Sequence, residues 1–386
     1  MSNDHGIYRS LQRHLNKQPI GFPAALLGSD IRFLRRIFTP EETKVALTLS
    51  YKLSSLDEIA PKVSPEFSTA QTTALLEKML QKGTIGWKKK NNTDHWYLIP
   101  LVVGIYEHVQ DGQADAEFLK DADAYIRTLP YSTAFVNVNP PQMRTIPINK
   151  SVSMLHPVST YNQIRGLIEK AGGPFVVLPC ICRSKAALKG NPCKKTIRKE
   201  SCFAMNDSGN MILKRGNGRE ITREEALEFF KQSEADGLVL QPANTENPEF
   251  ICSCCGCCCG MLAVQHFLPN PVEFWNSDYQ AEVDQALCKH CGKCVTRCQV
   301  HAVAQSGPKE KARVNLKRCI GCGLCVPTCP AKAISLKKKE QTAPLPKDEE
   351  ALYEEIMKNK KSVWAQMATM FKIGVKIGKP WARPKF

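Results

Sequence analysis

Long apolar segments are missing from this chain of 386 residues. The longest apolar run, from Tyr97 to Tyr106, covers ten residues and contains a proline, whereas a membrane-spanning helix needs about 20. The N-terminus also lacks a charged start followed by an apolar stretch and a cleavage site, so we expect no secretory signal. Both absences favour a cytoplasmic protein.

Cysteine is absent from both ends of the chain, because all 18 cysteines lie between Cys180 and Cys329. A reducing cytosol keeps thiols free, which argues against a disulfide framework. Cysteines that only fill a hydrophobic core would stand singly, but here they stand in tight groups. We therefore interpret them as metal ligands.

Recognisable catalytic groups are also missing. No glycine-rich phosphate motif follows a predicted strand, so neither a flavin nor a nicotinamide site is indicated. The segment Gly216-Asn217-Gly218 is typical of a turn, and no catalytic acid, base or nucleophile can be assigned. Whether the chain is an enzyme stays open, and the sequence indicates no small-molecule substrate.

The N-terminal third has the pattern of a small helical domain with a hairpin. The residues predict helices over 39–53 and 56–60 and a third helix from Ser68, followed by β-type runs over 84–88 and 96–99. Three helices and a hairpin resemble a winged helix–turn–helix domain.

This winged-helix-like region has a weak surface for reading DNA. Its third helix has only Lys78 and Lys82 as basic residues, and base recognition normally needs more donors there. Lys88, Lys89 and Lys90 near the wing would suffice for a nonspecific phosphate contact. Protein docking is the preferred use of this region, and nucleic-acid binding stays as the alternative.

The middle of the chain has an α/β pattern. Helices are expected over 160–171 and 223–235, the second starting with a capping box at Thr222, and strands over 175–178 and 238–240. Both strands lie close to cysteine groups. We therefore expect this region to present metal ligands at the ends of its strands.

The strongest pattern is a duplicated cysteine motif. The spacing C-x2-C-x2-C-x3-C occurs twice, 31 residues apart, and the flanking residues repeat as well. This spacing binds bacterial-type [4Fe–4S] clusters, in which the fourth cysteine of each motif serves the other cluster. The first cluster is assigned Cys288, Cys291, Cys294 and Cys329, and the second is assigned Cys319, Cys322, Cys325 and Cys298.

Small residues and one substitution accompany this motif. Gly292, Gly321 and Gly323 allow each loop to close tightly around a cluster. Paired structural zinc sites are the alternative, but they lack a third cysteine in the same short run. Gln299 stands where a proline usually follows the fourth cysteine, and we expect this change to loosen or expose one cluster without removing a ligand.

Ten further cysteines precede the duplicated motif. Four of them are spaced loosely enough for a zinc site as well as for a cluster: Cys180, Cys182, Cys193 and Cys202. The stretch from Ile251 to Gly260 holds the other six: Cys252, Cys254, Cys255, Cys257, Cys258 and Cys259. Neighbouring residues of an extended chain point to opposite sides, so this string should serve two metal centres or one larger one. The nearby duplicated motif favours iron–sulfur over zinc or Cu(I).

At these positions the sequence resembles a family of multi-cluster 4Fe-4S dicluster ferredoxin-domain proteins from anaerobes. The resemblance lies in the segments Thr145-Ile146-Pro147-Ile148, Pro179-Cys180-Ile181-Cys182-Arg183, Glu200-Ser201-Cys202 and CSCCGCCC at 252–259. Members carry CxCR and CxCCGCCC-type strings before a two-cubane domain, often after a winged-helix-like segment. The resemblance covers about residues 140–335 and, loosely, 37–105. It implies electron transfer in anaerobic metabolism and names no substrate.

Positive charge dominates the chain, with a formal net charge of +16. Thiolate-bound clusters are anionic, so nearby cations offset the cost of burying them. From Arg183 to Lys199 there are seven basic residues and no acid. Four more basic residues flank the ligands of the duplicated motif: Lys289, Lys293, Lys317 and Arg318.

The C-terminal tail is the other basic segment, with eight basic residues and no acid over 356–386. Trp364, Met367, Phe371 and Val375 recur there at helical spacing with lysines between them. An amphipathic basic helix suits a partner groove or an anionic membrane surface, and packing on its own protein is the alternative. Peripheral contact with the inner face of a membrane therefore stays open.

Together these observations predict an α+β multidomain protein. Its parts are an N-terminal arm (1–36), a winged-helix-like domain (37–105), a linker region (106–150), a small cysteine-rich α/β metal-binding domain (151–275), a bacterial 2[4Fe-4S] ferredoxin domain (276–338) and a basic helical tail (339–386). The expected cofactors are two [4Fe-4S] clusters in the ferredoxin domain and one or two further clusters, with zinc as an option at the Cys180 group.

The expected function is the relay of low-potential electrons through several clusters to or from a partner oxidoreductase. Two alternatives stay open. One is a redox-sensing winged-helix transcriptional regulator, and the other is a reductase with a catalytic cluster at Cys252–Cys259.

Overall fold

The structure, a computed structural model, describes residues 3–108, 115–148, 151, 163–268, 270–340, 343–362, 364–369 and 371. Over these ranges it is a mixed α+β protein with several small sheets. The described residues form two compact units, of which unit 1 comprises those within 1–139, 210–217 and 353–371 and unit 2 comprises those within 140–209 and 218–352. Among the described residues, no helix is long and apolar enough to cross a membrane.

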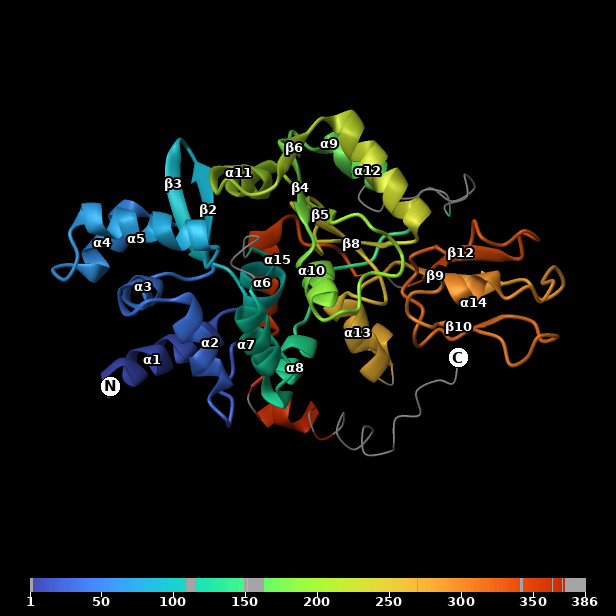
Figure 1. Cartoon of the computed structure of the whole chain (residues 1–386), viewed down its shortest axis with the longest axis horizontal. Helices are drawn as coiled ribbons and strands as arrows, with labels where there is room; N and C mark the ends of the chain where they lie inside the picture. The colour runs from blue at the N-terminus through green and yellow to red at the C-terminus, as the bar shows by residue number, and fades with distance from the viewer. Residues whose placement is uncertain are drawn as a thin grey trace. The chain divides into compact units, whose positions relative to one another are not determined.

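Unit 1 begins with two helices where an N-terminal arm was expected. They are α1 (Asn3–Lys17) and α2 (Ser29–Ile37), drawn in dark blue in Figure 1. Leu11, Phe33 and Leu34 are fully buried. Apolar residues at helical spacing bury one face of each helix, so this segment belongs to the core of unit 1.

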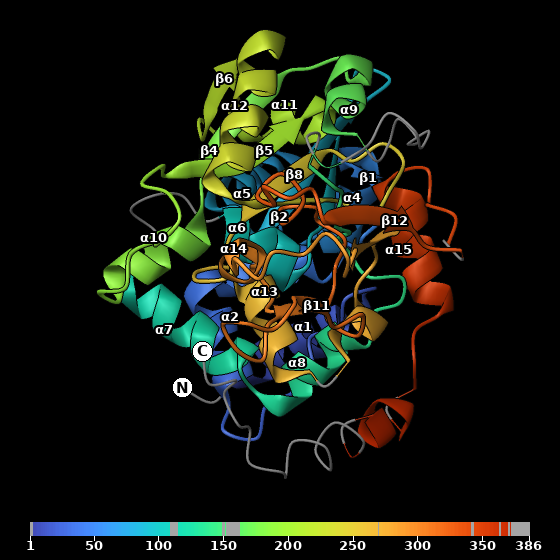
Figure 2. The ribbon, with the colours of Figure 1, turned by 90° about the vertical axis from the view of Figure 1, so that its right-hand side faces the viewer.

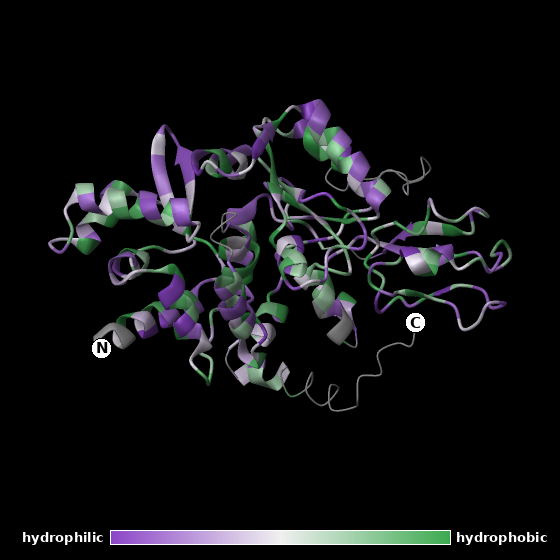
Figure 3. Cartoon of the chain, viewed as in Figure 1, coloured by the Kyte–Doolittle hydropathy of each residue, from purple (hydrophilic) through white to green (hydrophobic). Residues whose placement is uncertain are grey.

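The next elements follow the predicted order. They are α3 (Pro40–Ala46), β1 (Ser54–Ser55), α4 (Leu56–Val63), α5 (Thr69–Lys82), β2 (Ile85–Lys90) and β3 (Thr93–Leu98), with sheet order β1-β3-β2. Thr39 and Ser68 close the capping boxes that start α3 and α5. The β2–β3 hairpin is largely hydrophilic (Figure 3). Assignment of these elements to the winged-helix class stays a prediction.

The first of these helices is shorter than predicted, because α3 ends at Ala46 and not near Leu53. The backbone N–H of Leu98 donates a hydrogen bond of 2.7 Å to the carbonyl of Ser50. This bond to the hairpin holds the chain after α3 in a non-helical course. Tertiary contacts of this kind override helix propensity.

The expected linker region is also folded, and its described residues up to Asn139 belong to unit 1. After a turn at Leu101–Ile105, it contains α6 (Tyr106–His108), α7 (Ala116–Ile126) and α8 (Leu129–Val136). Tyr125 and Tyr131 are fully buried, with ring centroids 5.0 Å apart. Two segments from later in the chain reach unit 1, the end of α11 (Asn206–Lys214) and the end of α15 (Glu349–Lys358).

Unit 2 contains a five-stranded antiparallel sheet with the order β6-β4-β5-β8-β7. Its strands are β4 (Phe175–Pro179), β5 (Glu200–Met205), β6 (Arg219–Ile221), β7 (Val239–Pro242) and β8 (Phe250–Cys254). Helices α9 (Ile164–Lys170) and α12 (Arg223–Asp236) lie side by side near it (Figures 1 and 2). The capping box at Thr222 is present, and the predicted start of α9 lies partly outside the described residues.

The position of the cysteines corrects one expectation about this sheet. Cys202, Cys252 and Cys254 lie within β5 and β8, whereas Cys180 follows the end of β4 and Cys255 follows the end of β8. In an antiparallel sheet, neighbouring strands run in opposite directions, so their ends do not gather at one edge. The sheet presents ligands from its face as well as from its edge.

The remaining elements of unit 2 are short. They are α10 (Ile181–Leu188), α13 (Gly260–Phe267), a 3-10 turn (Pro271–Phe274), β9 (Tyr279–Val283), α14 (Lys293–Arg297), β10 (Val303–Ala304), β11 (Arg313–Val314) and β12 (Ile334–Lys338). Strand β9 pairs antiparallel with β12, and β10 pairs antiparallel with β11. One hydrophobic core runs from the large sheet into this region and includes Phe203, Leu240, Ala302 and Leu324.

A substitution of Phe203 tests how much this shared core contributes to stability. Its side chain is 1% exposed, and its ring centroid lies 4.9 Å from that of Phe230 and 6.0 Å from that of Phe175. Phe203→Ala leaves a cavity, so we expect a loss of about 3–5 kcal/mol in the free energy of unfolding. Anaerobic denaturation followed by far-UV circular dichroism measures this loss. Ile197→Ala, at a fully exposed residue of the same unit, is the control, and an equal effect in both variants would contradict the prediction.

Candidate metal centres

The backbone of the duplicated motif repeats along with its cysteines. Gly292 and Gly323, 31 residues apart, both have left-handed φ angles, of 68° and 73°. The pair His290 and Gly321 has φ angles of 57° and 65°. Left-handed backbone at a non-glycine residue is uncommon, so a histidine that adopts it at the equivalent position shows that the loop geometry itself is repeated.

The fourth cysteine of each repeat also has the same environment. The backbone N–H of Ala302 donates to the sulfur of Cys298, and that of Ala333 donates to the sulfur of Cys329, each over 3.2 Å. Backbone N–H groups directed at ligand sulfurs are typical of iron–sulfur sites, because they stabilise negative charge on sulfur.

We expected the fourth cysteine of each repeat to bind the cluster of the other repeat. The structure supports this for Cys298 and the cluster of the second repeat. The charge of Cys298 acts on the thiols of Cys319, Cys322 and Cys325, which belong to the other repeat. Cys294 is influenced in the same way by Cys291 and Cys288. The complete ligand assignment for both clusters stays a prediction.

The buried thiols of the second repeat, Cys319, Cys322 and Cys325, need a bound cation in order to ionise. Burial raises the pKa of Cys322 to about 12 and raises the pKa of Cys319 and Cys325 as well. Cluster ligands are thiolates, so positively charged iron must offset this effect. The donor set, the N–H groups and the tight loops all fit [4Fe–4S] clusters.

Gln299 does not loosen the module as its replacement of proline led us to expect. The residue is 4% exposed. Its Oε1 accepts from the backbone N–H of Gly256 at 2.9 Å, and its Nε2 donates to the carbonyl of Gly237 at 3.0 Å. A Cβ on Gly256 would collide with the carbonyl oxygen of Gln299. Gln299 therefore joins the duplicated motif to the CSCCGCCC string.

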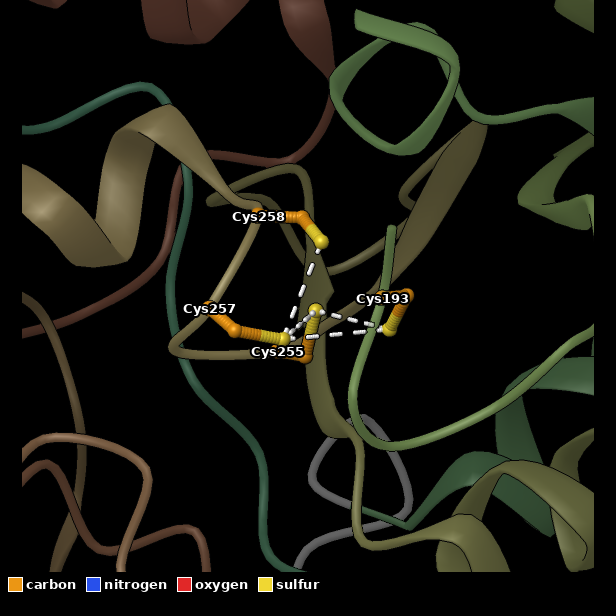
Figure 4. Close-up of side chains that lie close together, drawn as sticks. All are labelled: Cys193, Cys255, Cys257 and Cys258. Atoms are coloured by element: carbon orange, nitrogen blue, oxygen red, sulfur yellow. Dashed lines mark hydrogen bonds between the residues drawn. The ribbon is translucent and has the colours of Figure 1, made fainter. Parts of the chain in front are cut away.

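The ten upstream cysteines divide into two groups. Cys193, Cys255, Cys257 and Cys258 place their sulfurs within 4.8 Å of one another (Figure 4). The Cys255 and Cys257 sulfurs are 3.4 Å apart, and that of Cys193 lies 3.6 Å from Cys255. We name these residues the four-thiol group. Cys255 is buried and Cys257 is exposed, so the group reaches the surface.

The four-thiol group has the composition of a site for zinc or for one cluster. Burial raises the pKa of Cys193, but hydrogen bonds from the backbone N–H groups of Lys195 and Thr196 and from the side chains of Cys255 and Arg183 together lower that pKa to about 7. Burial raises the pKa of Cys255 to about 12. One thiol is thus ready to ionise near neutral pH, and the group can hold a further metal centre.

The other six cysteines meet on one face of the large sheet. In the strand register, Cys202 of β5 lies opposite Cys252 of β8, and residues directly opposite point to the same face. Cys254 is two residues from Cys252 and shares that face. Cys180 and Cys182 stand at the start of α10, and Cys259 stands before α13.

These six residues form what we name the six-thiol ring. In each of the pairs Cys180–Cys182, Cys182–Cys259, Cys259–Cys254, Cys254–Cys252, Cys252–Cys202 and Cys202–Cys180, one sulfur shifts the pKa of the other, so the six thiols are near neighbours. The neighbouring sulfur is the main cause that raises the pKa of Cys182, Cys202, Cys252 and Cys254. The pKa of Cys180 is lowered because its sulfur accepts from Cys182 and Cys202.

The sequence predicted all ten upstream cysteines as metal ligands and predicted that the CSCCGCCC string serves two centres or one larger one, but it could not assign each cysteine to a group. The initial grouping of Cys180, Cys182, Cys193 and Cys202 is wrong in one member, because Cys193 lies with the four-thiol group and not with the other three. The role of Gln299 was missed as well. Its departure from the usual proline was the available signal, but the partner lies 43 residues away and no local pattern connects them.

Comparison with known proteins supports the duplicated motif alone. A family model described as a 4Fe-4S dicluster domain matches residues 281–336. Neither the curated proteins nor the solved structures contain a match to the chain. Two [4Fe-4S] clusters are therefore expected in the matched domain, and the four-thiol group lies outside it.

Gly321 tests the geometry of the dicluster domain. Its φ of 65° is left-handed, and a Cβ there would collide with the carbonyl oxygen of Tyr279 and with Oγ of Ser277. We expect Gly321→Ala to displace the loop of Cys319 and Cys322 and to remove about four irons per chain. Iron analysis of anaerobically purified protein measures this.

Gly307 offers a matched control in the same domain. A Cβ there would meet only the Cγ of Glu310, at 3.8 Å. Gly307→Ala should keep the full iron content. If Gly321→Ala also kept it, the left-handed loop would not be required for cluster binding.

Proposed function

We propose that the chain is an iron–sulfur electron-transfer protein that passes single electrons between its dicluster domain and a partner oxidoreductase. The observation that carries this proposal is the duplicated ligand loop, matched as a 4Fe-4S dicluster domain over 281–336. Bound [4Fe–4S] clusters accept and release one electron each, at potentials tuned by hydrogen bonds to sulfur and by nearby charge.

Direct contacts between the cysteine groups support a relay through more than two centres. Gln299 follows the ligand Cys298 and bonds to Gly256 inside the upstream string. Arg318 precedes Cys319 and donates to the carbonyls of Gln265 and Leu268 at the end of α13. Both contacts lie within unit 2, so the dicluster domain and the upstream sites share one scaffold.

The winged-helix-like elements of unit 1 favour a docking role over DNA binding. Both basic residues of α5 pair with the buried carboxylate of Glu42, Lys82 at 2.6 Å and Lys78 at 3.7 Å. Near the hairpin, Lys214 pairs with Glu77 at 3.0 Å and lies over the ring of Trp87. Cations held by acidic partners contribute less to binding phosphates.

The regulator hypothesis has a direct test. Gel-shift assays with genomic DNA, using oxidised and reduced protein, should show no more than weak binding that disappears with added salt. A stable, redox-dependent shift at physiological salt would instead favour the transcriptional regulator.

The electron-transfer function predicts a specific loss in the Cys322→Ala variant. The anaerobically purified chain should take up electrons from reduced methyl viologen and develop a paramagnetic signal. Cys322→Ala removes one ligand, so we expect about four fewer irons per chain and a correspondingly smaller electron uptake. Both quantities can be measured by iron analysis and by reductive titration followed with electron paramagnetic resonance.

The control for this experiment is Ser335→Ala, at an exposed residue of β12 in the same domain. It should leave the iron content and the electron uptake unchanged. Full-length protein that contained the clusters but could not be reduced and reoxidised reversibly would contradict the proposed function.

A further inference from the structure

The strands and turns that carry the cysteines determine which of them join the six-thiol ring. In the CSCCGCCC string, Cys252, Cys254 and Cys259 turn toward the ring, whereas Cys255, Cys257 and Cys258 turn toward the four-thiol group. Cys252 and Cys254 share one face of β8 because they are two residues apart. The string therefore supplies both groups from opposite sides of one backbone segment.

We propose that Cys180, Cys182, Cys202, Cys252, Cys254 and Cys259 bind one iron–sulfur centre that is larger than a single [4Fe–4S] cluster. The choice of iron over zinc rests on the proposed electron-transfer function. The claim that all six thiolates serve one centre rests on the geometry of the ring.

The number and arrangement of the sulfurs argue for a single large centre. A [4Fe–4S] cluster takes four thiolates, and a zinc ion also takes four. Each of the six thiols has two of the others as neighbours that shift its pKa, and the strand register independently places Cys202 opposite Cys252. A four-iron cluster would leave two of these neighbouring thiols with no metal to bind.

Gln241 provides an independent sign of an anionic occupant. It lies opposite Cys252 in the β7–β8 register, so its side chain is on the cysteine face of the sheet. The residue is fully buried, and among the described residues neither its Nε2 nor its Oε1 has a hydrogen-bond partner. A buried amide is normally paired, and an N–H donor at this position suits a sulfide or thiolate of a bound cluster.

Arg183 adds a buried positive charge between the two upstream groups. It is 6% exposed, and its Nη2 donates to the carbonyl of Ser253 at 3.0 Å. Its Nε and Nη1 are buried and have no oxygen or nitrogen partner in the described part of the chain. Its side chain also hydrogen-bonds to Cys193 of the four-thiol group. A buried cation at this position is expected beside an anionic cluster.

A pair of zinc ions sharing six thiolates is the main competing occupant. It would supply only cysteine sulfurs as hydrogen-bond acceptors. An iron–sulfur centre also carries inorganic sulfides, which accept from N–H groups. The unpaired amide of Gln241 therefore favours iron, and metal analysis distinguishes the two.

The first experiment removes the four-thiol group and leaves the ring intact. In the full chain, Cys257→Ala with Cys258→Ala changes one exposed and one half-buried residue, so the fold should survive. After anaerobic iron–sulfur reconstitution, we expect clearly more than about 12 irons per chain, since the dicluster domain accounts for about eight and one additional cubane for four. About 12 irons or fewer, or about two zinc ions per chain, would overturn the proposal.

The second experiment changes the donor and not the ligands. Gln241→Leu keeps a side chain of similar size and removes the amide N–H. We expect the reduction potential of the upstream centre to become more negative while those of the dicluster domain stay unchanged, because one hydrogen bond to sulfur is lost. An unchanged upstream potential would contradict the placement of Gln241 against the centre.

Failure of this inference can be told apart from failure of the proposed function. The dicluster domain has its own ligands, so its paramagnetic signal should persist in Cys252→Ala, where only the iron of the ring is lost. A normal dicluster signal with no iron in the ring rejects the larger centre alone. Loss of reversible reduction in the dicluster domain of the unmodified chain rejects the proposed function.

Discussion

The repulsion between crowded, buried sulfurs is the physical constraint on which the rest of unit 2 depends. All 18 cysteines lie in this unit. Burial and neighbouring sulfurs raise the pKa of most of the thiols for which a shift is found, among them Cys252, Cys254 and Cys325. Ligand thiolates at such positions need positive charge nearby. Bound metal supplies most of it, and the protein contributes cations and N–H groups at selected positions.

The supporting polar groups also hold the cysteine sites together. Arg318 donates to the last turn of α13, where a cation compensates the free carbonyls of a helix end. Arg297 donates to the carbonyls of Glu234 and Ala235 at the end of α12. Basic residues beside the ligands therefore have two effects. They reduce the cost of burying anionic centres, and they join the dicluster domain to the ends of α12 and α13.

The sequence predicted those features that depend on local spacing. The duplicated motif, the capping box at Thr222 and the strands β2, β3, β4 and β7 follow from residues a few positions apart. It could not predict features that depend on pairing between distant segments. The antiparallel sheet brings Cys202 against Cys252, and no period in the sequence encodes that register. The division of ten cysteines into four and six follows from the register and from the turn after β8.

The early end of α3 has the same explanation. Its residues favour a longer helix, but the bond from Leu98 to Ser50 joins the chain to a strand 48 residues away. The N-terminal helices show the opposite case. The sequence of these helices has mixed charge and weak periodicity, so their apolar face could not be predicted. The structure shows that this face, which includes Leu11 and Phe33, is buried.

The two repeats of the dicluster domain have diverged at the point where they meet the rest of the unit. The second repeat keeps proline after its fourth cysteine, Pro330, whereas the first has Gln299. Proline has no N–H and no polar side chain, so it could not bond to both Gly256 and Gly237 as Gln299 does. Duplication supplied two equivalent ligand loops, and one of them could exchange its proline for a contact without losing a ligand. Gln299 in the first repeat therefore joins the domain to the upstream string, and Arg318 beside the second repeat joins it to α13.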